Sequence, residues 1–538
     1  MLQGHLFVLM GDIFHLQCTA RVVSAEGGVR LVPGRVWRRP GLPTRPDEPL
    51  SPDAYFGRWT KGINPPVGQP EPETWVVDVT DGRHSTPPKL CARICKLITT
   101  IIEEDRKERA NDPRGSRPPL HIALPFLGTG GAGAYDVRDH LLRLYLSDLG
   151  RIAQQEGVAI SLVFNNTNLG KSGYATAQML RQREIAQTFA NHGGLESLEN
   201  VRENLMSGRL AIFVGAGVSL SAGLPGWAKL LRHLHRQIEK KSQAKVPSWE
   251  ELHSLDPLLC AELLQSLWPV ADPADRCQAM SLAIQELVRA PRYGLLHALI
   301  AGLPVQDYVT TNYDDLLEKA ILDAGRSVQV IPSTSTSPRP GPRPCRLLKV
   351  HGSVAEDGAQ AEPTGIVLTL RDYQRFQKGA SALGGAVQGL MLSHHLLFVG
   401  YGMVDPNFIW LHESVARLLP TEQATQNSVG TALMVERENW KIELADRLLA
   451  GIHCRRPTEA APGDDQVLTD ARKLEIYLDY LGVISFSSLA AGRDQRLLSL
   501  LSEEDSSLIL ALRNLPMRDN ASTLAERVRR LRRELGIE

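Results

Sequence analysis

The sequence has few cysteines and no excess of charge of either sign. Seven cysteines among 538 residues are too few for a disulfide scaffold, and their odd number favours a reducing compartment. The 60 Lys and Arg residues equal the 60 Asp and Glu residues. A dedicated nucleic-acid or anionic-membrane binder would need a basic surplus. We therefore expect neither nucleic acid nor a membrane as a partner.

Long apolar runs are also missing. No stretch reaches the roughly 18 apolar residues of a membrane-spanning helix. Residues 1–14 are partly apolar, but no Lys or Arg precedes the apolar run and Asp12 closes it, which does not fit a secretory signal. The hydrophobic content of 43% is sufficient for packed cores. These features predict a globular, cytoplasmic protein.

Strands alternate with helices twice along the chain, which is typical of α/β units. The first series predicts strands at 5–9, 74–79, 120–125 and 159–164 and helices at 91–108 and 137–156. The second predicts strands at 209–214, 306–310, 346–350, 395–399 and 431–435 and helices at about 226–240, 256–267 and 277–300. We expect domains at 1–190 and 191–490 and a helical tail at 491–538.

Three segments lie outside this alternation. Residues 33–72 contain ten prolines and predict a long irregular excursion, and residues 332–344 predict a surface loop. In the tail, Thr523 and Glu526 have the spacing of a helix capping box. An apolar stripe follows them, and it suits either packing on the same chain or an oligomer contact.

A glycine turn follows the strand at 209–214. It reads Gly215-Ala216-Gly217, with Ser219, Pro225 and Trp227 close behind. Glycines allow backbone N–H groups to approach a pyrophosphate, whose charge is favoured at helix N-termini. An isolated Gly-x-Gly equally suits a turn that packs a helix on a sheet.

Three more strands of the second unit end in polar or small residues. Thr310 to Asp314 follow one strand, His351 follows the next, and Gly400 to Asp405 follow a third. In an open α/β sheet the carboxyl ends of the strands form the edge where ligands bind. The pattern therefore predicts one shared crevice. Ser219, Asp314 and Asp405 equally suit helix or turn caps, and Tyr401 suits packing.

Together, GAGVS…GLP, TNYD, HG and GYG resemble the sirtuin (silent information regulator) domain over about residues 200–480. The resemblance implies a Rossmann-like parallel-sheet domain that binds NAD and cleaves its nicotinamide–ribose bond. It implies catalytic roles for Asn312 and for His351, the latter as general base. It also implies NAD contacts from Gly215, Ala216, Gly217, Ser219, Pro225, Trp227, Thr310, Asp314, Gly400, Tyr401, Asp405 and Glu436.

Two departures separate the chain from the sirtuin deacylases. Those enzymes carry a phenylalanine–arginine pair where Trp227 and Ala228 stand, and two Cys-x-x-Cys pairs that hold a structural zinc. No cysteine lies between Cys345 and Cys454, so we expect no zinc. The chain instead resembles the zinc-free branch of bacterial anti-phage defence proteins of the Thoeris type.

That resemblance implies an NAD glycohydrolase that depletes NAD, gated by a signal or by oligomerisation. It also implies a homo-oligomer, such as a tetramer or filament. Two alternatives stay open. One is an NAD-dependent protein deacylase, and the other is a non-catalytic scaffold that binds NAD or ADP-ribose.

The first unit resembles the macro domain, which binds ADP-ribose-type nucleotides. Asp12 follows its first strand and a glycine run follows a later one. The resemblance implies that Asp12 meets an adenine, that the diphosphate is wrapped by Gly128, Thr129, Gly130, Gly131 and Gly133, and that Tyr135 stacks nearby. Residues 22–26 lack the asparagine-rich loop of hydrolytic macro domains. The glycine run equally suits a turn without a ligand.

Overall fold

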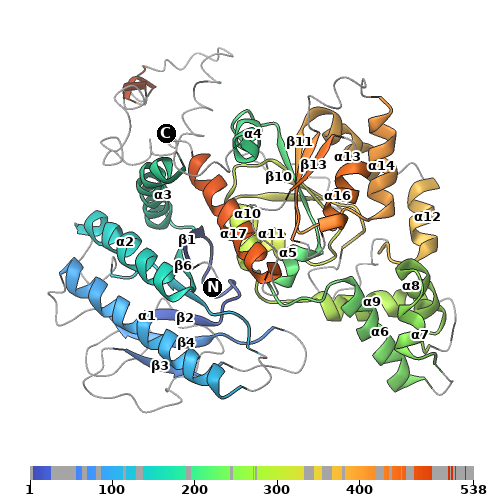
Figure 1. Ribbon diagram of the computed structural model, residues 1–538, viewed down its shortest axis with the longest axis horizontal. Helices are drawn as coiled ribbons and strands as arrows, with labels where there is room; N and C mark the ends of the chain where they lie inside the picture. The colour runs from blue at the N-terminus through green and yellow to red at the C-terminus, as the bar shows by residue number, and fades with distance from the viewer. Residues whose placement is uncertain are drawn as a thin grey trace.

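The computed structural model (Figure 1) describes residues 4–25, 56–62, 69–79, 86–112, 117–128, 137–189, 196–242, 246–270, 272, 275–332, 344–353, 366–378, 382–418, 429–435, 439–449, 451–455 and 466–486, and isolated positions between 507 and 528. Most of the expected tail, the glycine run after Gly128, Glu436 and most of the two proline-rich segments lie outside the described residues. The predicted domain limits stay predictions.

The first unit is a six-stranded sheet in the order β1-β6-β5-β2-β4-β3. β3 pairs antiparallel with β4, and the other pairs are parallel. The strands are β1 His5–Met10, β2 Ala20–Ala25, β3 Phe56–Thr60, β4 Glu73–Asp78, β5 His121–Pro125 and β6 Ala159–Phe164; the helices are α1 Pro87–Ala110, α2 Arg138–Glu156 and α3 Asn168–Phe189. The predicted strands and helices of this unit are confirmed.

Strands β2 and β3 escaped prediction, and β3 shows that 33–72 is not irregular throughout. Both carry a buried arginine. Arg21 donates from Nε to the Thr74 hydroxyl at 2.9 Å, and Arg58 pairs with Glu108 of α1 at 3.0 Å. An arginine inside a strand breaks the apolar pattern by which a buried strand is predicted. Its partners come from distant parts of the chain, so the sequence gives no local signal.

The second unit is a seven-stranded sheet in the order β13-β12-β11-β7-β8-β10-β9, and all its strand pairs are parallel. The strands are β7 Leu210–Val214, β8 Asp307–Thr310, β9 Val328–Ile331, β10 Cys345–Lys349, β11 His395–Val399, β12 Gly430–Leu433 and β13 Ile452–Arg455. The predicted Rossmann-like parallel sheet is therefore confirmed.

Helices join these strands. They are α4 Glu196–Met206, α5 Ala216–Leu220, α6 Trp227–Lys241, α7 Trp249–His253, α8 Pro257–Ser266, α9 Arg276–Val288, α10 Leu295–Gly302, α11 Leu316–Asp323, α12 Leu370–Lys378, α13 Ala382–Ser393, α14 Pro406–Ala416, α16 Asn439–Leu448 and α17 Gln466–Ile484. The single helix predicted over 277–300 is wrong, because α9 ends at Val288 and α10 begins at Leu295. Pro291 lies in the break, and Tyr293 bridges to Leu16 there.

The layers follow from the hydrophobic clusters. Helices α1 and α2 pack on one face of the first sheet. Its other face packs with α10 and α17, which also contact one face of the second sheet in the same continuous core. Helices α13 and α14 cover the far face of the second sheet. Helices α6 to α9 form a separate lobe with its own core (Figure 1).

Polar contacts reinforce the shared core between the two units. Asp479 of α17 accepts from His5 of β1 at 2.7 Å and is also bound by Arg181 of α3. Arg292 donates to Gln17 at 2.8 Å, and its backbone N–H donates to Gln69 at 3.0 Å. Buried charges are stable when they are paired in this way. The two sheets are therefore fixed relative to each other by both apolar and polar contacts.

Among the described residues, no helix is both long and apolar enough to cross a membrane.

Candidate functional site

The site lies where the strand order of the second sheet reverses. β7 leads on one side to β8, whereas β11 and its successors occupy the other side. Ligands of open α/β sheets bind in the crevice at this switch point. Here the loop after β7 touches the loop after β11. The Gly217 N–H donates to the Gly400 carbonyl at 2.8 Å, and the Gly215 N–H donates to Val399 at 3.0 Å.

Glycine is required at this contact for steric reasons. A Cβ on Gly215 would lie 2.5 Å from the Gly400 oxygen, and one on Gly217 would lie 2.7 Å from it. Gly400 itself has φ of 62°, which favours glycine. The N–H groups of Gly215 and Gly217 thus bind the neighbouring loop, and these glycines act by allowing close packing of the two strand ends.

A cavity of about 590 Å³ opens at this edge, a size typical of small-molecule sites. Most of the predicted residues line it: Ala216, Gly217, Ser219, Pro225, Trp227, Asn312, Asp314, His351, Gly400, Tyr401 and Asp405. Glu436 lies outside the described residues. Sequence reasoning missed other lining residues, among them Thr311, Tyr313, Tyr373 and Met403. Of these, Thr311 and Tyr313 belong to the TTNYD motif that carried the prediction, so they could have been included.

Ser219 is the centre of a buried hydrogen-bond network. Its hydroxyl donates to Asp314 Oδ2 at 2.8 Å and accepts from Asn312 Nδ2 at 3.0 Å. Burial lowers the pKa of His297 to about 4, so this imidazole is neutral. His297 Nδ1 accepts from the Gly294 N–H, which leaves Nε2 protonated and facing the Ser219 oxygen at 3.4 Å. The Ser219 hydroxyl is therefore engaged within the protein.

The same network fixes Asn312. Its Nδ2 also donates to the Gly215 carbonyl at 3.2 Å, so both amide hydrogens are used and the orientation of the amide is determined. Thr310 lies beneath it, accepting from the Asn312 N–H at 3.0 Å and donating to the Val214 carbonyl at 2.9 Å. Thr310 does not line the cavity. It instead joins β8 to β7 below the site.

A buried ion pair supports the loop from the other side. Lys349, with no exposed surface, pairs with Glu318 at 2.9 Å. Its ammonium group also donates to the carbonyls of Asp314 and Tyr313. Burial raises the pKa of Glu318, and the Lys349 charge opposes that rise. The pair holds the backbone that carries Asn312 and Asp314, a role that the sequence did not suggest.

His351 follows β10 and is 3% exposed. Its carbonyl accepts from the Val367 N–H at 3.1 Å, and its ring lies edge-on to Tyr373 at 5.3 Å. The next residue, Gly352, has φ of 86°. Burial lowers the pKa of His351, and the charge of Asp405 partly offsets this effect. The imidazole is therefore neutral near pH 7 and able to accept a proton.

Asp405 has two roles in the structure. Its Oδ1 caps α14 by accepting from the N–H groups of Asn407 and Phe408 at 2.9 and 3.1 Å. Its Oδ2 accepts from the Tyr373 hydroxyl at 2.9 Å and lies 3.7 Å from His351 Nε2. That last distance is too long for a hydrogen bond. It is short enough to stabilise a positive charge on the imidazole.

Three buried polar atoms of the cavity residues have no hydrogen-bond partner among the residues that the structure describes. They are Asn312 Oδ1, His351 Nε2 and the Tyr401 hydroxyl. An unpaired buried polar atom costs about 1–3 kcal/mol, and native structures contain few. All three belong to residues that line one cavity.

Tyr401 packs through its ring, whereas its buried hydroxyl has no partner among the described residues. Its ring contacts Phe213 at 4.6 Å and Phe408 at 5.6 Å, so the expected packing role is confirmed. Burial raises the pKa of its phenol well above the usual value, which keeps the hydroxyl a donor. Nearby, Met403 has φ of 57°, an uncommon conformation for a side-chain-bearing residue that is concentrated at functional sites.

A second cavity, also of about 590 Å³, lies on the other side of the glycine contact. The two cavities share Gly217 and Gly400 to Gly402. The walls of the second come from both units: Gln17, Cys18, Thr19, Pro118, Pro119 and His121 of the first, and Met434, Val435 and the α17 residues Ala471, Arg472 and Glu475 of the second. Sequence reasoning found neither this cavity nor the contribution of the first unit.

The structure places only part of the predicted ligand site of the first unit. The Asp12 N–H donates to the Tyr293 hydroxyl at 3.1 Å, and Asp12 Oδ1 accepts from the Phe14 N–H at 2.9 Å. Tyr293 thus covers the end of β1. Gly128 has φ of 94° and lies against Leu90 and Leu141. Thr129, Gly130, Gly131, Gly133 and Tyr135 lie outside the described residues.

Residues 306–455 match the family described as the SIR2-like domain. The match extends from β8 to β13 and contains the TNYD, HG and GYG segments. The second unit therefore carries a sirtuin-like domain.

Curated relatives point in the same direction. The chain is 28% identical over 232 residues to the NAD(+) hydrolase ThsA of Bacillus cereus (strain MSX-D12), covering 42% of this chain and 44% of that protein. It is 24% identical over 264 residues to the protein of the same name from Enterococcus faecium, with 47% and 51% covered. It is 24% identical over 237 residues to Defense-associated sirtuin 2 of Bacillus subtilis, with 42% and 21% covered. The chain thus spans about half or less of the length of these relatives.

Proposed function

We propose that this protein is an NAD glycohydrolase that cleaves the nicotinamide–ribose bond. The observation that carries the proposal is the group of three unpaired polar atoms, on Asn312, His351 and Tyr401, around the first cavity. Two acceptors and a donor suit the hydroxyl groups of a ribose and a water molecule. The relatives named NAD(+) hydrolase support the same reaction.

The chemistry needs little more than positioning and one base. The bonding electrons of the glycosidic bond leave with nicotinamide, whose pyridinium charge they neutralise. Water attacks the anomeric carbon and loses a proton to neutral His351, so that nicotinamide, ADP-ribose and a proton result. Asn312 Oδ1 accepts from a ribose hydroxyl or from the water and holds it for attack. Asp405 stabilises the imidazolium that forms.

The two cavities suit the two halves of a dinucleotide. The nicotinamide–ribose half occupies the first cavity, beside His351. The adenosine half extends past Gly217 and Gly400 into the second, next to the end of β12. The first unit then contributes a wall to the substrate site through Pro119 and its neighbours. The shape of the substrate site therefore depends on the packing of the two units against each other.

The biological role belongs to the proposal as well. We assign the activity to NAD depletion in anti-phage defence, in line with the name Defense-associated sirtuin 2 carried by a relative. Gating comes from homo-oligomerisation into a tetramer or filament, or from an ADP-ribose-type nucleotide at the macro-like first unit. A cytoplasmic location is supported by the seven cysteines, all of which are free.

Incubating the full chain with NAD and following nicotinamide and ADP-ribose tests the proposal directly, with and without added ADP-ribose-type nucleotides. Stoichiometric release of both products is expected. Turnover only with an acyl-lysine peptide, giving acyl-ADP-ribose, would instead identify a deacylase. Tight nucleotide binding with no turnover under any condition would identify a scaffold.

A further inference from the structure

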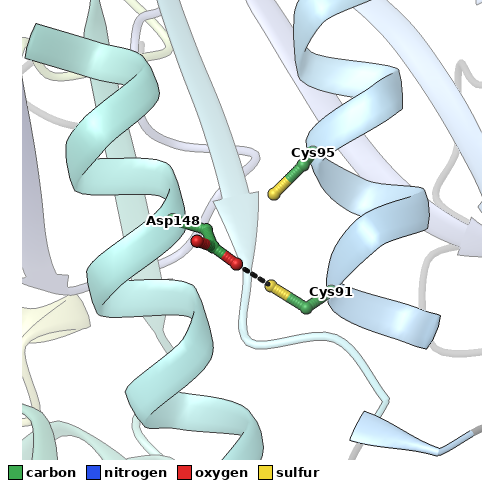
Figure 2. A group of neighbouring side chains, drawn as sticks. All are labelled: Cys91, Cys95 and Asp148. Carbon is green, nitrogen blue, oxygen red and sulfur yellow. Dashed lines mark hydrogen bonds between the residues drawn. The ribbon is translucent and has the colours of Figure 1, made fainter. Parts of the chain in front are cut away.

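Two cysteines and an aspartate of the first unit point toward one another (Figure 2), and none of the three lines either of the two cavities described above. Cys91 and Cys95 lie one turn apart on α1, and Asp148 faces them from the neighbouring helix α2. Each of the three is a potential metal ligand through a sulfur or a carboxylate oxygen. Their ligand atoms all lie within 4.8 Å of one another.

From this geometry we propose that Cys91, Cys95 and Asp148 bind a thiolate-preferring divalent cation of the zinc class, independently of the NAD site. A tetrahedral zinc ion with bonds of about 2.3 Å to sulfur and about 2.0 Å to oxygen holds neighbouring sulfur and oxygen ligands about 3.5 Å apart. The Cys91 sulfur and Asp148 Oδ2 are 3.5 Å apart. One cation therefore fits between them without movement of the helices.

The donor set selects the metal. Two thiolates favour zinc-like ions over magnesium or calcium, which prefer oxygen ligands. Three protein ligands leave the fourth tetrahedral position to water. Cys91 is buried, whereas Cys95 and Asp148 are half-buried, so solvent and the ion reach the site from the side of these two residues. Both cysteines are free thiols in the structure.

The charges balance when the cation binds. The Cys91 thiol now donates its hydrogen to Asp148 Oδ2, and the cation takes the place of that proton. Both thiols release protons to solvent, giving three negative ligands around a doubly charged ion. Arg151, whose guanidinium lies 3.8 Å from Asp148 Oδ1, sits on the other carboxylate oxygen. It offsets the remaining negative charge and leaves Oδ2 for the metal.

A bound cation would join α1 and α2 through its coordination bonds to Cys91, Cys95 and Asp148. These helices cover the outer face of the first sheet, and α1 also pairs with β3 through Glu108 and Arg58. A cation that binds only the folded unit raises the stability of that unit by linkage. The site is therefore structural and separate from the zinc lobe of the sirtuin deacylases.

The test is a titration of the reduced full-length chain with cobalt(II), followed by competition with zinc(II). One equivalent of cobalt is expected to produce thiolate-to-cobalt charge-transfer bands and the visible bands of a tetrahedral ion, and zinc is expected to abolish both. Cys95→Ser and Asp148→Asn remove one ligand each. The affinity of each variant for cobalt is expected to fall by at least about 10–100-fold, because even the loss of a residue that only hydrogen-bonds to a metal ligand has an effect of this size.

The matched control is Cys277→Ser, which removes an exposed cysteine outside the cluster and keeps parental binding. Zinc raises the unfolding temperature of the parent and of this control, but not that of Cys95→Ser. Asp148→Asn preserves the shape of the side chain, and its circular dichroism shows whether it is folded. The proposal is overturned by parental cobalt spectra in Cys95→Ser and Asp148→Asn, by absence of the bands in the parent, or by a Cys91–Cys95 disulfide that persists under reduction.

Discussion

His351 Nε2 faces Asp405 Oδ2 across 3.7 Å, and neither atom donates a hydrogen bond to the other. Burial lowers the pKa of His351, and the Asp405 charge counteracts this. The same carboxylate accepts from Tyr373 and caps α14. The proposed base is thus held next to a charge whose position is fixed by two further interactions.

This relationship predicts the pH dependence of Asp405→Asn. Asparagine keeps an oxygen for the α14 cap but removes the negative charge. The pKa of His351 then falls further below its usual value, so the acid limb of the kcat profile moves to lower pH. The plateau rate falls because the weaker base accepts a proton less readily and its imidazolium is no longer stabilised. Measuring kcat from pH 4 to pH 8 in both proteins checks this. An unchanged acid limb would show that Asp405 does not act on the titrating group.

The base itself is tested by His351→Ala. General-base catalysis contributes typically 10²–10⁴-fold, so we expect nicotinamide release to fall by at least about 100-fold. Binding of NAD should change little, because the base acts mainly in the transition state. The control is His140→Ala, an exposed histidine on α2. Parental rates in His351→Ala would exclude this histidine as the base.

The features of the fold and site that could be predicted from the sequence are those that depend on residues close together in the chain. The strand ends were predictable because an apolar strand followed by Gly215 or Gly400 is a local pattern. The hydrogen bonds of the Ser219 hydroxyl could not be predicted, since His297 and Asp314 are 78 and 95 residues away in the sequence. Strands β2 and β3 escaped prediction because Arg21 and Arg58 bind Thr74 and Glu108, which are 53 and 50 residues away along the chain. The hydrogen bond from the Asp12 N–H to the Tyr293 hydroxyl likewise joins residues that are 281 positions apart.

The second cavity, between the two units, is predicted to bind the adenosine half of NAD and not the nicotinamide half. Pro119→Trp adds an indole at an exposed position of the second cavity wall, and Ala471→Trp adds one at a half-buried position of the same wall on α17. Both are expected to raise the KM for NAD, because the adenosine half is displaced. Cleavage of nicotinamide mononucleotide, which lacks that half, should be unchanged. Arg106→Trp, on an exposed face of α1, is the control.

The outcome separates two failures. If the parent cleaves NAD and both tryptophan variants keep the parental KM, the adenosine half lies elsewhere and only the placement is wrong. If the parent cleaves neither substrate, the hydrolase assignment itself is wrong. Equal losses with both substrates would indicate a general disturbance of the site rather than displacement of adenosine.

The glycine contact at the switch point predicts a steric effect of Gly217→Ala. The added Cβ would lie 2.7 Å from the Gly400 oxygen and 2.8 Å from its Cα, distances that backbone atoms cannot relieve without separating the loops. We expect a loss of about 1–3 kcal/mol in the free energy of unfolding, as for overpacked cores, together with weaker NAD binding. Gly385→Ala is the matched control, because no atom lies within 4 Å of its added Cβ and the position is in helix α13. There alanine should stabilise by about 0.5–1 kcal/mol. Urea unfolding of the parent and both variants measures these changes, and the free energy of unfolding should fall in Gly217→Ala and rise in Gly385→Ala. Equal changes in both variants would contradict the steric explanation of the contact.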